Sequence, residues 1–397
     1  MSPPSSPSPP TDGSSSTLSA LTRGPFIRVT LANFTFFICF ASFFLLPQYL
    51  RGLGATNDEI GDIFAVFGLT AIPLTPLVGM LVDRYRRRPV FLFGAMLMFA
   101  SSTAFAFVDH LSPVLYLLRA LQGAAFACCF TAATTLAVDL APPDRRAQAL
   151  GIFGVFTLIT HGVAVTIAEF IVARFGFDGL FYVAPLWCIV AALCFIGVPE
   201  THRGHAWKKG SSLVKLVFNP AIFPAFGVSV LAGAGFGVAL TFVPVLGEVI
   251  QIEHVSVFFL AYTAAAIAIR ILGGRLADLY GRRTVAFPSL LLLGLAVVSL
   301  GLIQGQGGLA MAGLLFGAGH GLLYPALNAL VVDACEVSDR GKGMALYNAS
   351  FNLGITSGTI VFGRVAEAEG YATMFFAAGV TVLAGLLLFR IRPPRDT

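Results

Sequence analysis

A ten-residue stretch that occurs twice constrains this chain more than any other feature. The copies are Gly79-Met80-Leu81-Val82-Asp83-Arg84-Tyr85-Arg86-Arg87-Arg88 and Gly274-Arg275-Leu276-Ala277-Asp278-Leu279-Tyr280-Gly281-Arg282-Arg283. Each copy lies between two long apolar runs, so a buried helix ends in a tight turn that carries one carboxylate and several guanidinium groups. Equivalent positions are 195 residues apart, which predicts a duplicated membrane domain.

The repeat continues beyond this stretch. Gly123 matches Gly317 and Asp139 matches Asp333, in both cases 194 residues later. Most of the identity between the two halves has been lost, yet the spacing of these positions is kept. The second half therefore repeats the architecture of the first.

Composition indicates a protein that crosses a membrane several times. Apolar residues make up 57% of the chain and charged residues 11%, whereas about a quarter of a soluble domain is charged. The net charge of +5 comes from basic residues in short loops between apolar runs, which predicts contact with lipid headgroups and no nucleic-acid partner. Five of the six cysteines lie inside apolar runs, so we expect neither a disulfide framework nor a metal site.

The apolar runs have the length of membrane-spanning helices, which need about 20 residues each. They predict an all-α membrane protein with twelve transmembrane helices in two pseudo-symmetric six-helix halves. The expected helices are residues 26–50, 58–82, 89–109, 112–139, 147–173, 178–199, 220–247, 256–279, 284–304, 307–334, 342–366 and 371–391.

Polar segments divide the chain. Residues 1–24 are rich in Ser and Pro and predict a disordered tail. The first half is expected at 25–199, a basic linker at 200–219, the second half at 220–392 and a short tail at 393–397. Most Lys and Arg residues fall on the side that holds both tails, and by the positive-inside rule that side is cytoplasmic.

The duplicated stretch resembles the loop between the second and third helices, and its repeat between the eighth and ninth, in the major facilitator superfamily. The second copy is nearly complete, and the first departs at Arg86, where the family usually has Gly. The resemblance implies the major facilitator fold. It also implies that Asp83 meets the backbone near Gly343–Ala345 and that Asp278 meets the backbone near Ala147–Gly151, so that the halves are latched on the cytoplasmic side. A topology-setting charge is the simpler alternative. The predicted gating residues are Gly79, Asp83, Arg84, Arg87, Arg88, Gly274, Asp278, Gly281, Arg282 and Arg283.

Arg119 lies inside the expected fourth helix, where a guanidinium costs roughly 2.5–3.5 kcal/mol on insertion scales. Arg119, Gln122 and Gly123 share one helix face by their spacing. This resembles the family's fourth-helix motif, whose arginine is assigned to proton coupling. An anchor that bonds neighbouring helices is the alternative.

Three further residues could titrate during transport. Glu169 is the acid whose estimated depth in the membrane is closest to that of Arg119. His161 and His320 fall near the middle of the membrane. A histidine can change charge near neutral pH, but within a helix bundle it often serves only as a hydrogen-bond donor.

Other polar residues of the second half could line a cavity or pair across the bundle. Arg270 is a possible partner of Asp333. Tyr324 and Asn328, with Asn348 and Asn352, are candidates for contact with a substrate. Phenylalanines of the first half could line a cavity or face lipid, and the sequence does not separate these roles for Phe36, Phe37, Phe40 and Phe130.

The sequence thus predicts a secondary transporter of the bacterial inner membrane that moves a small amphipathic compound outward in exchange for protons. We expect it to act as a monomer and without a cofactor. An importer that carries an organic anion or sugar with protons is one alternative, and a membrane receptor that transports nothing is another. An enzyme is not expected, and a phosphate-binding loop, Gly-x-x-x-x-Gly-Lys-Ser/Thr, is absent from the sequence.

Overall fold

The structure of the protein is a computed structural model that describes residues 24–84, 86–142, 145–200, 216, 218–220, 222–273, 276–336 and 339–391. For residues 83, 147, 278, 390 and 391 it describes the backbone alone. All regular elements in these ranges are helical. The predicted all-α class is confirmed, and it follows from the solvent, because helices satisfy their own backbone hydrogen bonds in hydrocarbon.

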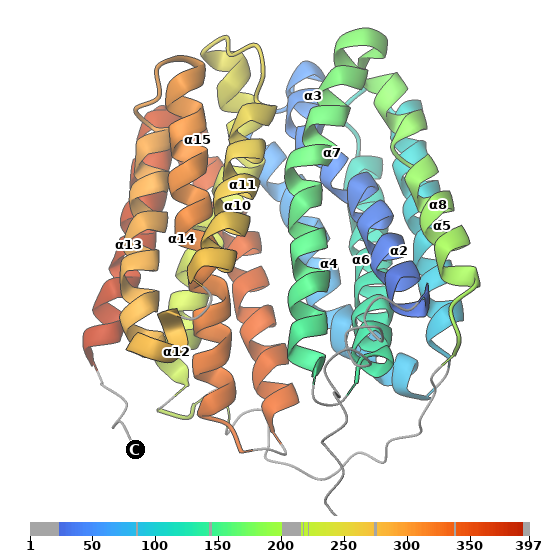
Figure 1. Ribbon diagram of the computed structural model, residues 1–397. Helices are drawn as coiled ribbons and strands as arrows, with labels where there is room; N and C mark the ends of the chain where they lie inside the picture. The colour runs from blue at the N-terminus through green and yellow to red at the C-terminus, as the bar shows by residue number, and fades with distance from the viewer. Residues whose placement is uncertain are drawn as a thin grey trace, which may run out of the picture.

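The helices of residues 24–196 form one bundle, on the right of Figure 1. The first spanning segment is continuous from Gly24 to Gly52 and consists of α2, η1 and α3. The elements of this bundle are α2 (Gly24–Ser42), η1 (Phe43–Leu45), α3 (Leu46–Gly52), α4 (Asn57–Arg84), α5 (Arg87–Ala104), η2 (Phe105–Phe107), α6 (Pro113–Leu140), α7 (Arg146–Val183) and α8 (Leu186–Ile196).

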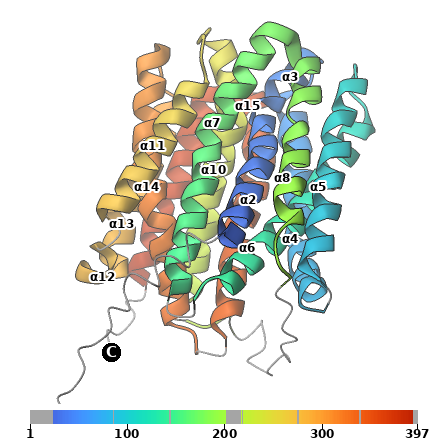
Figure 2. The same cartoon turned by 45° about the vertical axis from the view of Figure 1, so that its right-hand side comes forward.

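A second bundle follows on the left of Figure 1, and Figure 2 shows the same pair of bundles turned by 45°. Its elements are α10 (Phe223–Val249), α11 (Ser256–Gly273), α12 (Leu276–Tyr280), α13 (Arg282–Leu300), α14 (Gly305–Asp333) and α15 (Arg340–Ile391). The predicted helix 256–279 is described as α11 to Gly273 and as α12 from Leu276, and the two residues between these elements lie outside the described residues.

Ten helical segments of the described chain are long and apolar enough to cross a membrane. Two of them, Gln148–Ile196 and Arg340–Phe389, run for 49 and 50 residues, or about 75 Å if straight, whereas a bilayer core is about 30 Å thick. Each contains a non-helical glycine, Gly176 in α7 and Gly370 in α15. Both glycines have positive φ angles, which reverse the chain at little cost only for Gly. They fall where the sequence predicts breaks between successive helices.

The matched glycines Gly123 and Gly317 bring helices together in the same way in both bundles. A Cβ atom on Gly123 would lie 2.4 Å from the carbonyl oxygen of Phe67 in α4. A Cβ atom on Gly317 would lie 2.2 Å from the carbonyl oxygen of Tyr262 in α11. The backbones therefore touch at both positions, and only Gly fits.

The matched aspartates also have the same partners. Arg87 Nη2 lies 2.6 Å from Asp139 Oδ2, and Arg282 Nε lies 2.5 Å from Asp333 Oδ2. Each pair ties the start of one helix to the end of the next at one end of the molecule, which we call the motif end because it holds the turns at residues 84–87 and 280–282. The opposite end is called the far end.

Replacement of Gly123 or Gly317 by Ala should destabilise the fold by about 1–3 kcal/mol, because the new methyl group overlaps a neighbouring carbonyl. Thermal unfolding of the purified protein should show a lower midpoint for both variants. Gly151→Ala is the control: a Cβ there meets nothing within 4 Å, so it should be neutral or stabilise α7 by up to about 1 kcal/mol. Equal midpoints for all three variants would contradict the packing described above.

Candidate functional site

A cavity of about 440 Å³ lies between the two bundles and is the candidate site. This volume is within the range of small-molecule pockets, roughly 300–1,000 Å³. Side chains of both bundles form its wall, so a change in the angle between the bundles would change its shape.

The wall contributed by the first bundle is aromatic. Phe37 contacts the rings of Phe40, Phe126 and Phe130 edge to face, with ring centroids 5.5–5.7 Å apart. Phe37, Phe40 and Phe130 line the cavity, which settles their role, whereas Phe36 packs against Phe91 within its own bundle. This wall can pack against an apolar or aromatic part of a ligand that carries no hydrogen-bonding atoms.

The wall contributed by the second bundle is polar. The Tyr262 hydroxyl lies 3.2 Å from Nδ1 of His320, and the Tyr324 hydroxyl donates to Asn348 Oδ1 at 2.5 Å. Asn352 Nδ2 donates to the Asn348 carbonyl at 2.8 Å. His320 and Tyr324 were both predicted from sequence, and both line the cavity.

His161 reaches the cavity from α7 of the first bundle. Its Nδ1 donates to the Thr157 carbonyl at 3.2 Å, so its Nε2 is the atom left to accept a proton. Its ring lies 6.1 Å from that of Tyr262, which belongs to the other bundle. The surroundings of His161 therefore depend on how the two bundles are placed.

Arg119 is buried, with 5% of its surface exposed. Its Nη1 donates to Gln122 Oε1 at 2.8 Å, and Gln122 donates in turn to Ser102 at 2.9 Å. The rings of Phe64 and Phe67 lie 4.5 and 5.0 Å from the guanidinium carbon. Arg119 and Gln122 thus lie on one helix face, as predicted, and form a hydrogen-bonded series with Ser102. Among the described residues this series includes no carboxylate.

Arg270 lines the cavity near the motif end of α11. Its Nε donates to the Gly321 carbonyl at 3.1 Å, next to His320 in the chain. The suggested pairing with Asp333 is wrong, because Asp333 binds Arg282. Asp333 ends its helix at the motif end, about three turns from Gly321, which Arg270 contacts.

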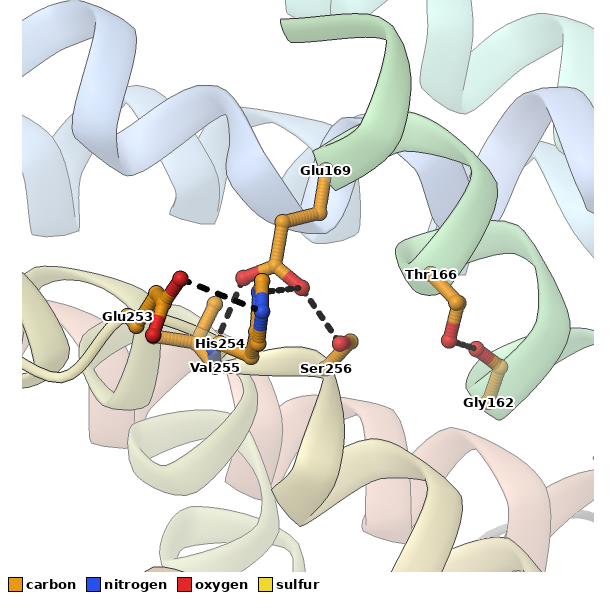
Figure 3. A network of polar contacts seen from close by, with 7 residues as sticks. All are labelled: Gly162, Thr166, Glu169, Glu253, His254, Val255 and Ser256. Carbon is orange, nitrogen blue, oxygen red and sulfur yellow. Dashed lines mark hydrogen bonds and ion pairs between the residues drawn. The ribbon is translucent and has the colours of Figure 1, made fainter. Parts of the chain in front are cut away.

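Glu169 lies in the contact between the bundles and not beside Arg119 (Figure 3). It accepts hydrogen bonds from the Val255 amide at 2.7 Å and from the Ser256 hydroxyl, and His254 Nδ1 is 3.7 Å away. Glu169, suggested from its depth as the acid nearest to Arg119, makes its contacts with the second bundle instead. Depth along a helix says nothing about the direction in which the side chain points.

Further polar contacts join the bundles at the far end. Asn57 bonds to Glu367 at 2.9 Å and to the Tyr371 hydroxyl, while Arg364 pairs with Asp62 at 3.2 Å. We call this set the far-end seam; its members are Gln48, Arg51, Asn57, Asp62, Glu169, Pro244, His254, Val255, Ser256, Arg364, Glu367 and Tyr371.

At the motif end the two copies of the repeated stretch differ. Gly281 has a φ of 87° at the start of α13, a conformation that favours Gly, whereas Arg86 is extended before α5. Glu200 accepts hydrogen bonds from the Arg87 and Arg88 amides at 2.9 and 3.2 Å and so caps α5. Glu200 was not predicted, although an acid directly after an apolar helix and before a basic linker was a usable signal.

Several predicted gating residues cannot be placed. The side chains of Asp83 and Asp278 and the whole of Gly274 lie outside the described residues, as do the side chain of Ala147 and the latch contact expected there. Gly79 has open space around it, and the Arg283 guanidinium lies over the Phe389 ring at 5.8 Å. Arg84 ends α4. Asn328 has a buried side-chain oxygen without a partner in the described part and is not part of the cavity wall.

Comparisons with known proteins agree with one another. A family model described as Major Facilitator Superfamily matches residues 29–271 and 250–397. The multidrug resistance protein MdtL of Shewanella oneidensis is 35% identical over 164 residues, 41% of this chain and 41% of that protein, so the match spans about two fifths of that relative. The staphylopine export protein of Staphylococcus aureus is 21% identical over 386 residues, 93% of this chain and 96% of that protein.

Solved structures show the same fold. The nucleoside transporter NupG superposes with a TM-score of 0.76 at 16% identity, covering 92% of this chain and 99% of that one. A bacterial homolog of the human lysosomal transporter Spinster gives a TM-score of 0.75 at 16% identity, covering 92% and 95%. At this level of identity the likeness concerns the arrangement of the helices.

Glu169→Gln should loosen the far-end seam, because an amide nitrogen replaces one of two acceptor oxygens that face donors. A hydrogen bond to a charged group contributes about 1.5–3 kcal/mol, so amide hydrogen exchange in residues 252–258 should become at least about tenfold faster. Asp109→Asn is the control, since Asp109 is an exposed acid at the same end whose side-chain partner is the neighbouring His110. Unchanged exchange in the Glu169 variant would show that this carboxylate does not hold the seam.

Proposed function

The chain belongs to the Major Facilitator Superfamily and is an integral membrane transporter, and from this premise we propose that it exports a small amphipathic compound across the bacterial inner membrane in exchange for protons. The observation that carries the proposal is the cavity, whose wall is shared by two bundles that meet at a polar seam. The staphylopine export protein is named for export, and MdtL is named for multidrug resistance, which efflux would explain.

The proposed topology has twelve transmembrane helices. The two long segments would each cross the membrane twice, with the reversals at Gly176 and Gly370. The halves would be 25–199 and 220–392, joined by a linker at 200–219 and flanked by tails at 1–24 and 393–397. The positive-inside rule then makes the motif end and both tails cytoplasmic, and the far end external.

In this topology the described conformation is closed toward the outside. The far-end seam consists of hydrogen bonds and ion pairs that are partly exposed to solvent. Exposed ion pairs such as Asp62 with Arg364 contribute little individually and can be exchanged for water when the seam opens. We propose that rocking of the two halves opens the seam and closes the motif end, where Asp83 and Asp278 would act as latches, and that a monomer is sufficient for this movement.

Glu169 is the proposed site where the proton enters. In the closed seam the Val255 amide and the Ser256 hydroxyl both donate to the Glu169 carboxylate. A carboxylate accepts both hydrogen bonds, whereas a protonated carboxyl group would bring a third hydrogen atom into the same contact. His161 lies two turns nearer the motif end on the same face of α7, at i and i+8, and lines the cavity. A proton released on closure could therefore pass to His161 and onward to the cytoplasm.

The wall of the cavity supports a carrier of this kind. Among its described residues neither Asp nor Glu is present, and His161 and His320 carry imidazole nitrogens that can bind a proton. The compound and the proton would then not compete for one carboxylate in the cavity. Opening and closing of the seam would couple export to proton entry instead.

The test uses proteoliposomes with an acidic interior, in which the cytoplasmic end of the protein faces the outer medium. A transported aromatic amphiphile added outside should enter and drive protons out, which a trapped pH-sensitive dye reports as alkalinisation. Glu169→Gln and His161→Gln should reduce this proton movement at least tenfold, and Asp109→Asn should leave it unchanged.

Two results would contradict the proposal. Proton movement in the same direction as the compound would indicate symport. Movement of neither compound nor proton across a broad panel of amphiphiles would favour a receptor.

A further inference from the structure

We infer that the compound carried is an organic anion, with its acidic head beside Arg270 and its apolar body on the phenylalanine wall. This inference rests on the proposed transport function, since it identifies the class of substrate for the same cavity. Four observations carry it: the charge of the wall, the contacts of Arg270, the contacts of Arg119 and the chemistry of the opposite wall.

The wall of the cavity is positively charged. Arg119 and Arg270 are its permanently charged residues, and in the described part of the protein no carboxylate lines it. Charges taken out of water are costly unless a partner compensates them. An anion in the cavity would compensate both guanidinium groups, whereas a cation would add repulsion to each.

Arg270 is the group that a ligand can reach. It is half-buried, and its one hydrogen bond to the described residues uses Nε, which donates to the Gly321 carbonyl. The two terminal nitrogens are not bonded to any described acceptor, and the side chain lines the cavity. A guanidinium held in this way presents the pair of parallel N–H groups that binds a carboxylate in a bidentate manner.

Other donors surround this position. The Gly321 carbonyl that orients Arg270 follows His320 in the chain, and His320 contacts the hydroxyl of Tyr262 and the ring of Tyr324. The Tyr324 hydroxyl donates to Asn348, and one proton lies between Tyr262 and His320, so this pair keeps one further O–H or N–H donor for an acidic head. The second-bundle wall therefore offers a donor beside a cation, an arrangement that suits an anion.

Arg119 contributes to the positive potential and is not the proposed contact. Its guanidinium lies against the rings of Phe64 and Phe67, and Gln122 takes one of its donors. With 5% of its surface exposed, it has little room for a ligand head. Across the cavity from Arg270, the rings of Phe37, Phe126 and Phe130 form an apolar surface for the body of the compound.

The sign of the charge also suits export. The cytoplasmic side of a bacterial membrane is electrically negative, so outward movement of an anion is favoured by the membrane potential itself. A carrier for anions would therefore need no acid in its cavity to gain a driving force.

Three probes that share one ring system test the inference: 2-naphthoate (anion), 2-naphthamide (neutral) and 2-naphthylmethylammonium (cation). Binding to the full-length protein in nanodiscs is measured by calorimetry. We expect naphthoate to bind at least tenfold more tightly than naphthamide, and the cation to bind most weakly. A wild-type protein that binds the amide or the cation as tightly as naphthoate, or that fails to bind naphthoate, would overturn the inference.

Variants assign the preference to Arg270. Arg270→Gln should bring the naphthoate-to-naphthamide affinity ratio close to one, while Arg270→Lys should retain only part of it, because Lys keeps the charge but not the pair of parallel N–H groups. Arg174→Gln is the matched control, since Arg174 is exposed at the far end over Phe170 and should not alter the ratio. A purely structural role of Arg270 would lower the affinity for all three probes together and leave the ratio unchanged, which would also overturn the inference.

Transport of the same probes separates this inference from the proposed function. Proton movement driven by the cation or the amide, but not by naphthoate, would leave the exporter standing and reject the anion site. Binding of naphthoate that depends on Arg270, without movement of any probe, would support the anion site and reject transport.

Discussion

Compensation of charge in a medium without water is the constraint on which the rest of this structure depends. At the motif end each repeat pairs an arginine with an aspartate, Arg87 with Asp139 and Arg282 with Asp333. These pairs fix the ends of helices and repeat across the two halves. Within the described residues, Arg119 and Arg270 have no such partner and belong to the cavity wall. The contrast separates paired charges that hold the fold from Arg270, which is available to a ligand, and from the buried Arg119, which adds positive potential.

Close backbone contacts occur both within and between the bundles. Within a bundle, Gly123 and Gly317 place one backbone directly against another. Between the bundles, a Cβ atom on Gly61 in α4 would lie 2.3 Å from the Thr359 carbonyl oxygen in α15. The far-end seam adds side-chain hydrogen bonds and partly exposed ion pairs, such as Asp62 with Arg364. Rocking of the bundles would therefore have to separate both kinds of contact.

Much of this architecture is predictable from the sequence, and the reasons are physical. Spanning helices follow from the length of apolar runs, and the repeat of Gly123 at Gly317 follows from a spacing that packing preserves. The direction of side chains is not encoded in this way. Glu169 has the depth expected from its position in the chain, yet it faces α11 and not Arg119. The partner of Arg270 likewise depends on the rotation of its helix about the helix axis. The pattern of apolar residues does not predict this rotation, because the helices are apolar on most sides.

The aromatic wall and the seam show the same limit. A phenylalanine on a spanning helix is equally compatible with lipid, with a neighbouring helix and with a cavity, and only the fold distinguishes Phe37 from Phe36. Asn57 and Glu367, 310 positions apart, meet because two halves of the chain come together at one end. No local signal in the sequence reports such a contact.

Opening of the far-end seam is required if the two halves rock around the cavity, and cross-linking of Asn57 to Glu367 tests this most directly. A variant with Asn57→Cys and Glu367→Cys would be treated in proteoliposomes with a short reversible thiol cross-linker, with each single variant as a control for the native cysteines. Transport should stop on cross-linking and recover fully when a reductant cleaves the linker. Transport at an unchanged rate by fully cross-linked protein would show that the seam does not have to open.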